Sequence, residues 1–135
     1  MSILINIDVP DVEAALAFYG SAFGLTVRRR FGSDGVELEG WPSPVFLLSK
    51  DAGSVGAGSD LRTYERHWTP VHLDVVVDDI EVAHARALAA GAKAESEIKI
   101  ARWGKLALMS DPFGHGLCLT EFLGRGYDEI ADEKQ

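Results

Sequence analysis

Residues 3–25 read ILINIDVPDVEAALAFYGSAFGL, and residues 70–92 read PVHLDVVVDDIEVAHARALAAGA. When Asp11 is aligned with Asp79, the apolar positions of the two stretches coincide. The alignment pairs Ile5 with Leu73, Ile7 with Val75, Val9 with Val77, Val12 with Ile80 and Ala15 with Ala83. Self-similarity of this kind indicates that one structural unit occurs twice in the chain.

Each stretch predicts a strand followed by a helix. Apolar and polar residues alternate over 3–9 and over 71–77, which is the period of a half-buried strand. The apolar members of both runs, Val71 included, are expected to pack under the helices. Asp11 and Asp79 suit helix N-caps, and Gly24 and Gly91 stand where a helix needs a left-handed terminator; these two pairs bound the predicted helices.

Short strand-like runs follow both predicted helices. They are LTVRRRF (25–31), GVELEG (35–40) and PVFLLSK (44–50) in the first half, and AESEIKI (94–100), GKLALMS (104–110) and GLCLTEF (116–122) in the second. Each half therefore predicts a βαβββ module, and the chain an α+β fold.

The predicted organisation is one domain over 1–124. Module one covers about 2–50, a linker about 51–68 and module two about 69–123, and a charged C-terminal tail covers 125–135. The glycine-rich part of the linker, DAGSVGAGSD, is expected to be flexible, since it lacks the lysine and the spacing of a phosphate-binding loop.

Composition bounds the function classes. The chain has 135 residues, of which 47% are hydrophobic and 25% charged, as in globular proteins. A net charge of −8 disfavours nucleic-acid binding, which needs a basic face. No apolar run is long enough to cross a membrane, and the N-terminus lacks signal-peptide features. With a single cysteine excluding an internal disulfide, we expect a cytoplasmic protein.

The stretch DPFGHGLCLT, residues 111–120, contains a turn, His115 and the only cysteine, Cys118. Asp-Pro-Phe-Gly matches the residue preferences of a type I turn. Because alternating runs flank it, we predict a hairpin that joins the last two strands and places His115 at a rim.

The repeated modules, the segment FYGSAFGL at 18–25 and the segment DPFGHGLCLTEF at 111–122 resemble the vicinal oxygen chelate superfamily. This superfamily includes glyoxalase I, extradiol dioxygenases, and fosfomycin- and bleomycin-resistance proteins. The resemblance implies two paired βαβββ modules whose sheets curl into a cleft with the helices outside. It also implies a homodimer and, in many members, a divalent ion that chelates the substrate.

The resemblance also implies four metal-ligand positions, one on the first and one on the last strand of each module. In this sequence they fall on Leu4, Leu47, His72 and Cys118. A leucine cannot bind a metal, and a hard ion prefers oxygen and imidazole donors to a thiol. His72 is therefore the only intact position, and we expect no metal or other cofactor; a divalent ion is disfavoured.

The cleft that the resemblance implies would be lined by a mixed set of side chains. We expect ligand contacts from Asn6, Leu47, His72, Asp74, Trp103, Cys118 and Thr120, with Leu4 beside them. Trp41, Phe46 and Trp103 are expected either to stack on a planar ligand or to seal the subunit interface. His72 is the candidate acid or base. Cys118 is either a small buried hydrophobe, a nucleophile paired with His72, or a soft-metal ligand with it.

Two function classes remain open. The first is a small-molecule-binding protein of the glyoxalase/bleomycin-resistance type, whose cleft lacks the usual complete metal site. The second is a lyase, isomerase or dioxygenase-like enzyme with rearranged metal ligands, or with metal-free acid/base catalysis around His72. A second acidic or imidazole ligand near His72 would favour the enzyme; the candidates are Asp74, Asp8 and Glu121, of which Glu121 is expected to face away.

Overall fold

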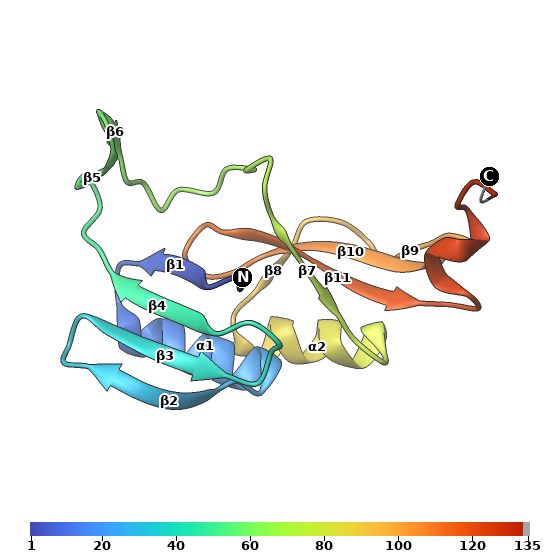
Figure 1. Cartoon of the computed structure of the whole chain (residues 1–135), viewed down its shortest axis with the longest axis horizontal. Coiled ribbons are helices and arrows are strands. Elements are labelled where there is room, and N and C mark those ends of the chain that lie inside the picture. Colours follow the sequence, from blue (N-terminus) through green and yellow to red (C-terminus); the bar gives the residue numbers. More distant parts are fainter. Residues whose placement is uncertain (134–135) are drawn as a thin grey trace.

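The computed structural model describes residues 1–133 and has one sheet and one helix in each half of the chain (Figure 1). The first half contains β1 (Ile5–Val9), α1 (Val12–Phe23), β2 (Thr26–Phe31), β3 (Gly35–Glu39) and β4 (Val45–Ser49). Its sheet has the order β1-β4-β3-β2, with β1 and β4 parallel.

The second half repeats this arrangement with one difference. It contains β7 (Leu73–Val76), α2 (Ile80–Ala90), β8 (Lys93–Ala94), β9 (Lys99–Ile100), β10 (Gly104–Ser110) and β11 (Gly116–Phe122). The sheet order is β7-β11-β10-β8, β9 also pairs with β10, and β7 is parallel to β11. The predicted α+β class is confirmed.

The single strand predicted over 94–100 is wrong, because the ladder with β10 is interrupted between β8 and β9. The amides of Glu95 and Ser96 both donate to the Leu108 carbonyl, at 2.9 and 3.3 Å. The Leu108 amide donates in turn to the Ser96 hydroxyl at 2.9 Å. This side-chain bond replaces a backbone partner and divides the run into two short strands.

Both helices begin and end where the sequence predicts. Asp11 accepts a hydrogen bond from the Ala14 amide at 3.0 Å, and Asp79 accepts one from the Val82 amide at 3.1 Å. Gly24 and Gly91 follow the helices with positive φ angles of 71° and 118°. A residue without a side chain adopts this conformation at little cost, so these glycines stop the helices.

The core lies between the helices and the sheets. α1 and α2 pack against each other on the same side of both sheets (Figure 1). The fully buried side chains include Val9, Val36, Leu38, Val45, Leu47, Ile80, Met109 and Leu119. The expectation that Val71 joins them is wrong, since it precedes β7 and its exposed fraction is 87%.

The segment between the modules, expected to be a flexible linker, contains secondary structure of its own. It forms a small hairpin of β5 (Val55–Ala57) and β6 (Asp60–Leu61), which turns at Gly58 with a φ angle of 58°. A short 3₁₀ helix, Gly126–Glu129, follows β11. Among residues 1–133, no helix is long and apolar enough to cross a membrane.

Candidate functional site

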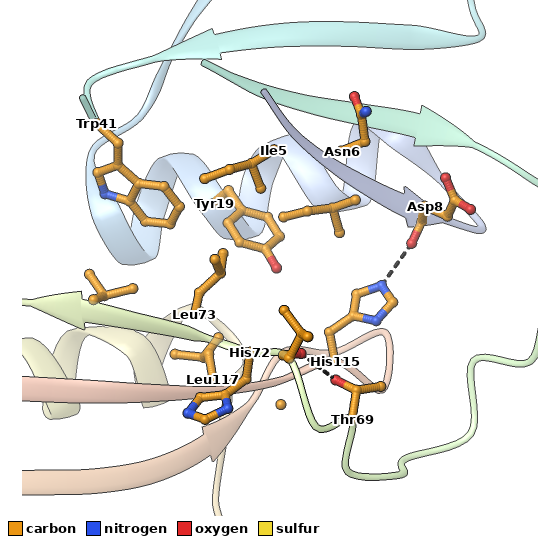
Figure 2. A pocket seen from close by; sticks show the side chains of 14 residues that line it. Ile5, Asn6, Asp8, Tyr19, Trp41, Thr69, His72, Leu73, His115 and Leu117 are labelled. Carbon is orange, nitrogen blue, oxygen red and sulfur yellow. Dashed lines mark hydrogen bonds between the residues drawn. The ribbon is translucent and has the colours of Figure 1, made fainter. Parts of the chain in front are cut away.

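A cavity of about 570 Å³ lies where the two sheets meet (Figure 2). β1 and β7 are each at the edge of their own sheet and are not hydrogen-bonded to one another. The gap between these two edge strands, called the seam below, leads to the cavity, whose wall is formed by side chains on the core-facing sides of the strands. Its apolar wall consists of Ile5, Ile7, Tyr19, Trp41, Leu73, Val75 and Leu117. Two rings and five aliphatic side chains therefore give the cavity a largely apolar interior.

Polar residues also border this cavity, namely Asn6, Asp8, Thr69, His72 and His115. Asn6 and His72 alternate with Ile5 and Leu73, so their side chains point away from the apolar wall (Figure 2). The His115 ring nitrogen Nε2 is 2.7 Å from the Asp8 carbonyl oxygen, so the ring carries a proton there and donates it (Figure 2). The Arg62 guanidinium is 2.8 Å from the Asp8 carboxylate and balances its charge.

The hairpin between β10 and β11 positions His115, and the predicted hairpin is confirmed. The Asp111 amide donates to the His115 carbonyl at 2.8 Å. Asp111 Oδ1 accepts from the amides of Phe113 and His115, at 2.8 and 2.9 Å. Gly114 has a φ angle of 91°, and a β-carbon there would lie 2.3 Å from the Tyr64 carbonyl oxygen. The loop is thus fixed by the aspartate and by a position that only glycine fits.

The other oxygen of Asp111 faces the first half of the chain. Tyr19, on α1, donates its hydroxyl to Asp111 Oδ2 at 2.7 Å, and both side chains are buried. Burial, and next the negative charge of Asp111, hold the pKa of Tyr19 well above its usual value. Tyr19 is therefore a neutral hydrogen-bond donor that ties the cavity wall to the hairpin.

A second cluster lies on the side of β7 and β11 that faces away from the helices. The His72 Nε2 atom is 3.1 Å from Asp74 Oδ1, and Cys118 on β11 pairs with Asp74 on β7. Burial, followed by the negative charge of Asp74, raises the pKa of Cys118 to about 11. The thiol is protonated at neutral pH, so the pairing with His72 expected of a nucleophile is not formed.

Glu121 faces away from this cluster, as the alternation of β11 predicts. Its Oε1 accepts from the Ile80 amide at 2.8 Å, at the start of α2. Lys105 lies 3.0 Å from Glu81 and 4.0 Å from Glu121. These carboxylates are engaged by the helix N-terminus and a lysine, which leaves Asp74 as the acidic neighbour of His72.

Residues 4–120 match the family model described as "Glyoxalase-like domain". The chain belongs to this family. Within its known relatives, an uncharacterized protein of Mycobacterium bovis is 29% identical over 115 residues, which cover 79% of this chain and 74% of that protein. An uncharacterized protein of Mycobacterium tuberculosis is also 29% identical over 115 residues, which cover 79% of this chain and 66% of that protein.

Several solved structures share the fold of this chain. A glyoxalase/bleomycin resistance protein/dioxygenase family enzyme from Burkholderia phytofirmans has a TM-score of 0.69 at 20% identity, covering 89% of this chain and 97% of its own. A fosfomycin resistance protein from Listeria monocytogenes has a TM-score of 0.69 at 14% identity, covering 91% and 93%. Lactoylglutathione lyase from Agrobacterium tumefaciens has a TM-score of 0.60 at 19% identity, covering 89% and 92%.

The metal positions implied by glyoxalase-like relatives can be located through the strand registers. Cys118 pairs with Asp74 across β11 and β7, and the equivalent pair in module one is Phe46 with Asn6. Leu4, the counterpart of His72, precedes β1 and is 57% exposed. Neither Leu4 nor Phe46 can bind a metal, so the four-ligand site of the superfamily does not fit this chain.

One predicted cleft residue of the glyoxalase-like fold is misplaced. Leu47 lies on the side of β4 that faces the helix, with no exposed surface, and belongs to the core. The residue on the opposite side at this point is Phe46. The expectation that Leu47 lines the cleft is wrong, because a shift of one residue along a strand moves a side chain to the other face.

The remaining predicted ligand contacts divide into three groups. Asn6 and His72 line the cavity, and Asp74 lines a smaller cavity beside it. Cys118 and Thr120 are buried on the far side of β11. Trp103 lies elsewhere, with its ring 5.0 Å from that of Tyr127. The structure thus joins Asn6 with His72 and separates both from Trp103.

Tyr19 and His115 are cavity residues that sequence reasoning did not select. The alternation of β1 predicted ligand contacts from the face that carries Asn6, whereas the apolar wall is formed by Ile5 and Ile7 on the opposite face. Tyr19 had a usable signal, because a tyrosine on a buried helical face needs a partner for its hydroxyl. His115 was predicted at a rim, and the cavity includes it.

Proposed function

We propose that this glyoxalase-like protein binds a small molecule in the cavity between β1 and β7. The observation that supports this most strongly is the cavity itself, with an apolar wall and a border that includes polar residues. Its volume of about 570 Å³ is within the range of roughly 300–1,000 Å³ found for small-molecule sites. Binding there needs no metal, so this proposal matches the bleomycin-resistance type of the superfamily rather than its metalloenzymes.

The wall and the rim suggest the chemistry of the ligand. Trp41 and Tyr19 offer ring surfaces, with Trp41 held by Phe23 at a ring-centre distance of 5.4 Å. Thr69 and His115 offer groups that can accept hydrogen bonds. The net charge of −8 favours a neutral or cationic molecule over an anion. A planar, largely apolar ligand fits this arrangement.

A fragment screen by ligand-observed NMR, performed in excess chelator, tests the proposal. Trp41→Ala removes part of the wall, and Trp103→Ala is its matched control, because Trp103 is also half-buried and also packs on an aromatic ring. We expect planar apolar fragments to bind the wild type and the control, and to bind Trp41→Ala at least tenfold more weakly. Equal weakening by both substitutions, or no binding fragment, would contradict the proposal.

Catalysis around His72 is the second candidate function. The specific observation in its favour is the 3.1 Å contact between His72 Nε2 and Asp74 Oδ1, since a carboxylate can orient an imidazole as acid or base. The test is an assay for lactoylglutathione lyase activity, with and without added divalent ions, in the wild type and in His72→Ala. Turnover that requires His72 would make this function the better account; its absence would leave binding alone.

We propose that the protein forms a homodimer, in which its partner is a second copy of the same chain. Large apolar side chains near the ends of β1 and β7 are exposed, including Ile3, Leu4, Trp68, Val71 and Val76. A second chain that covers them would also border the cavity. Sedimentation velocity measures this directly: we expect a dimer, and expect charged substitutions at Val71 and Val76 to shift it toward monomer. A monomer at all concentrations would refute this proposal.

A further inference from the structure

We propose that the cavity between β1 and β7 continues into a smaller polar pocket around His115, and that this pocket selects ligands with a hydroxyl or amino group. The inference rests on the proposed small-molecule function and adds the chemical class of the ligand, a planar aromatic ring that carries one hydrogen-bond donor. The residues that would recognise the donor belong to β1, to the segment between the modules and to the turn between β10 and β11. None of them is a position implied for a metal ligand.

The smaller pocket adjoins the cavity and has a volume of about 240 Å³. The residues that line both spaces are Asp8, Thr69, His115 and Gly116. The other residues of the smaller pocket are Arg62, Thr63, Tyr64, His67 and Gly114. A ligand whose ring lies against the apolar wall of the cavity can therefore extend a substituent past Thr69 and His115 into a second space, which is more polar.

The His115 ring offers this pocket a hydrogen-bond acceptor. Its Nε2 atom is 2.7 Å from the Asp8 carbonyl oxygen and donates to it, since a carbonyl group can only accept. In a neutral imidazole the other nitrogen, Nδ1, then has a free lone pair. Within residues 1–133 no protein group is hydrogen-bonded to Nδ1, which lies on the side of the ring that faces away from Asp8 (Figure 2). A ligand hydroxyl or amino group would donate to this nitrogen.

Several contacts hold the imidazole in this orientation. The His115 amide donates to Asp111 Oδ1 at 2.9 Å, which fixes the main chain, while the bond to the Asp8 carbonyl fixes the ring. The Tyr64 ring packs on the imidazole at a ring-centre distance of 6.2 Å and an angle of 73°. Tyr64 is itself held, because its hydroxyl donates to the Lys50 carbonyl at 2.6 Å. An acceptor that is fixed before binding loses little conformational entropy when the ligand arrives.

The charges around the pocket favour a donor over an anion. Arg62 supplies a positive charge, but its guanidinium already donates to the Asp8 carboxylate at 2.8 Å and to the Val55 carbonyl at 2.6 Å. Burial, and next the negative charge of Asp8, raise the pKa of Tyr64 against the smaller opposing effect of Arg62. The potential beside Tyr64 is therefore negative, which repels a carboxylate and attracts an ammonium group or a hydroxyl proton.

Three ligands that share one ring system test the inference: naphthalene, 2-naphthol and 2-naphthoate. Each is titrated into the full-length protein and followed by ligand-observed NMR. We expect 2-naphthol to bind at least about fivefold more tightly than naphthalene, as one net hydrogen bond allows, and 2-naphthoate to bind most weakly. Naphthalene is the smallest of the three, so lack of space cannot explain its weaker binding. Naphthalene that binds as tightly as 2-naphthol, or 2-naphthoate that binds most tightly, would overturn the inference.

His115→Phe assigns the preference to one residue, because it removes the acceptor and keeps a ring of similar size. It should abolish the preference for 2-naphthol and leave the binding of naphthalene little changed. His84→Phe is the matched control: His84 lies on α2, outside both pockets, and its buried Nε2 atom has no hydrogen bond to lose. It should keep the wild-type preference. A preference that survives in His115→Phe would contradict the role given to His115.

A second measurement needs no variant and so does not depend on the folding of His115→Phe. In ¹⁵N spectra of the histidine rings at neutral pH, His115 Nδ1 should resonate as an unprotonated nitrogen and shift on addition of 2-naphthol, but not of naphthalene. An Nδ1 that carries the proton, or that does not respond to 2-naphthol, would refute the inference. Binding of naphthalene without a preference for 2-naphthol would refute the polar pocket alone, whereas no binding by any of the three would refute the proposed function as well.

Discussion

Tyr19 and Asp111 form a buried 2.7 Å hydrogen bond that joins the two halves of the chain. Tyr19 belongs to the FYGSAFGL segment and Asp111 begins the DPFG turn, so the bond connects the two segments that carry the family resemblance. Because Asp111 also accepts from two amides of its own loop, one carboxylate fixes the hairpin, the helix and the cavity wall between them.

Tyr19→Phe should destabilise the protein by about 1–3 kcal/mol, because it leaves a buried carboxylate oxygen without a donor. Urea denaturation measures the change in the free energy of unfolding. Tyr64→Phe is the matched control: its hydroxyl donates to the Lys50 carbonyl at 2.6 Å in an exposed position, and its loss should cost less. Equal losses in the free energy of unfolding for the two variants would show that the buried bond to Asp111 stabilises the protein no more than an exposed one does.

Stability should decline at alkaline pH through the ionisation of Tyr19. Burial and Asp111 raise the pKa of Tyr19 in the folded protein, whereas the unfolded chain ionises near its usual value of about 10. The stabilisation is complete below that value and is lost as the pH rises above it. Denaturation between about pH 8 and pH 11 should show a steeper decline for the wild type than for Tyr19→Phe. Parallel declines would contradict this.

Leu47→Ala should cost about 2–5 kcal/mol of stability, as expected for a truncated core leucine. Leu4→Ala, at a residue that is 57% exposed, should change stability by less than about 0.5 kcal/mol. Thermal or urea denaturation of the two variants compares them directly. A small effect at Leu47, combined with weaker fragment binding, would return this residue to the ligand site.

The Cys118 thiol should be unreactive in the metal-free folded protein. It is buried, and its pKa is raised to about 11, so the thiolate that attacks disulfide reagents is scarce at neutral pH. A thiol-specific disulfide reagent should react slowly with native protein and rapidly with protein in concentrated urea. Fast reaction without denaturant would restore Cys118 as a candidate nucleophile.

The sequence predicts what depends on local patterns. Asp11, Asp79, Gly24 and Gly91 bound the helices through contacts within a few residues, and the structure confirms all four. The flexible linker was a weaker prediction, since composition alone does not show that glycine-rich chain can close a hairpin at Gly58.

The cavity could not be predicted in the same way. PVFLLSK (44–50) is apolar on both faces, so its pattern does not show whether Phe46 or Leu47 faces the core. An error of one residue along the strand exchanges the two faces. Tyr19 and Trp41 reach the cavity because two edge strands meet without pairing, which is a property of the assembled sheets. His72 borders the cavity, but its imidazole contacts Asp74 on the side of β7 that faces away from the helices, so its predicted role in ligand binding stays a prediction.

The most direct test of the proposed function is amide chemical-shift mapping of ¹⁵N-labelled protein with the best fragment from the screen. We predict that the largest changes fall on residues 5–8, Trp41, residues 69–75 and residues 115–117, which surround the seam between β1 and β7. Changes centred on Phe122–Asp128 or on the outer faces of α1 and α2, with the seam unaffected, would contradict the account.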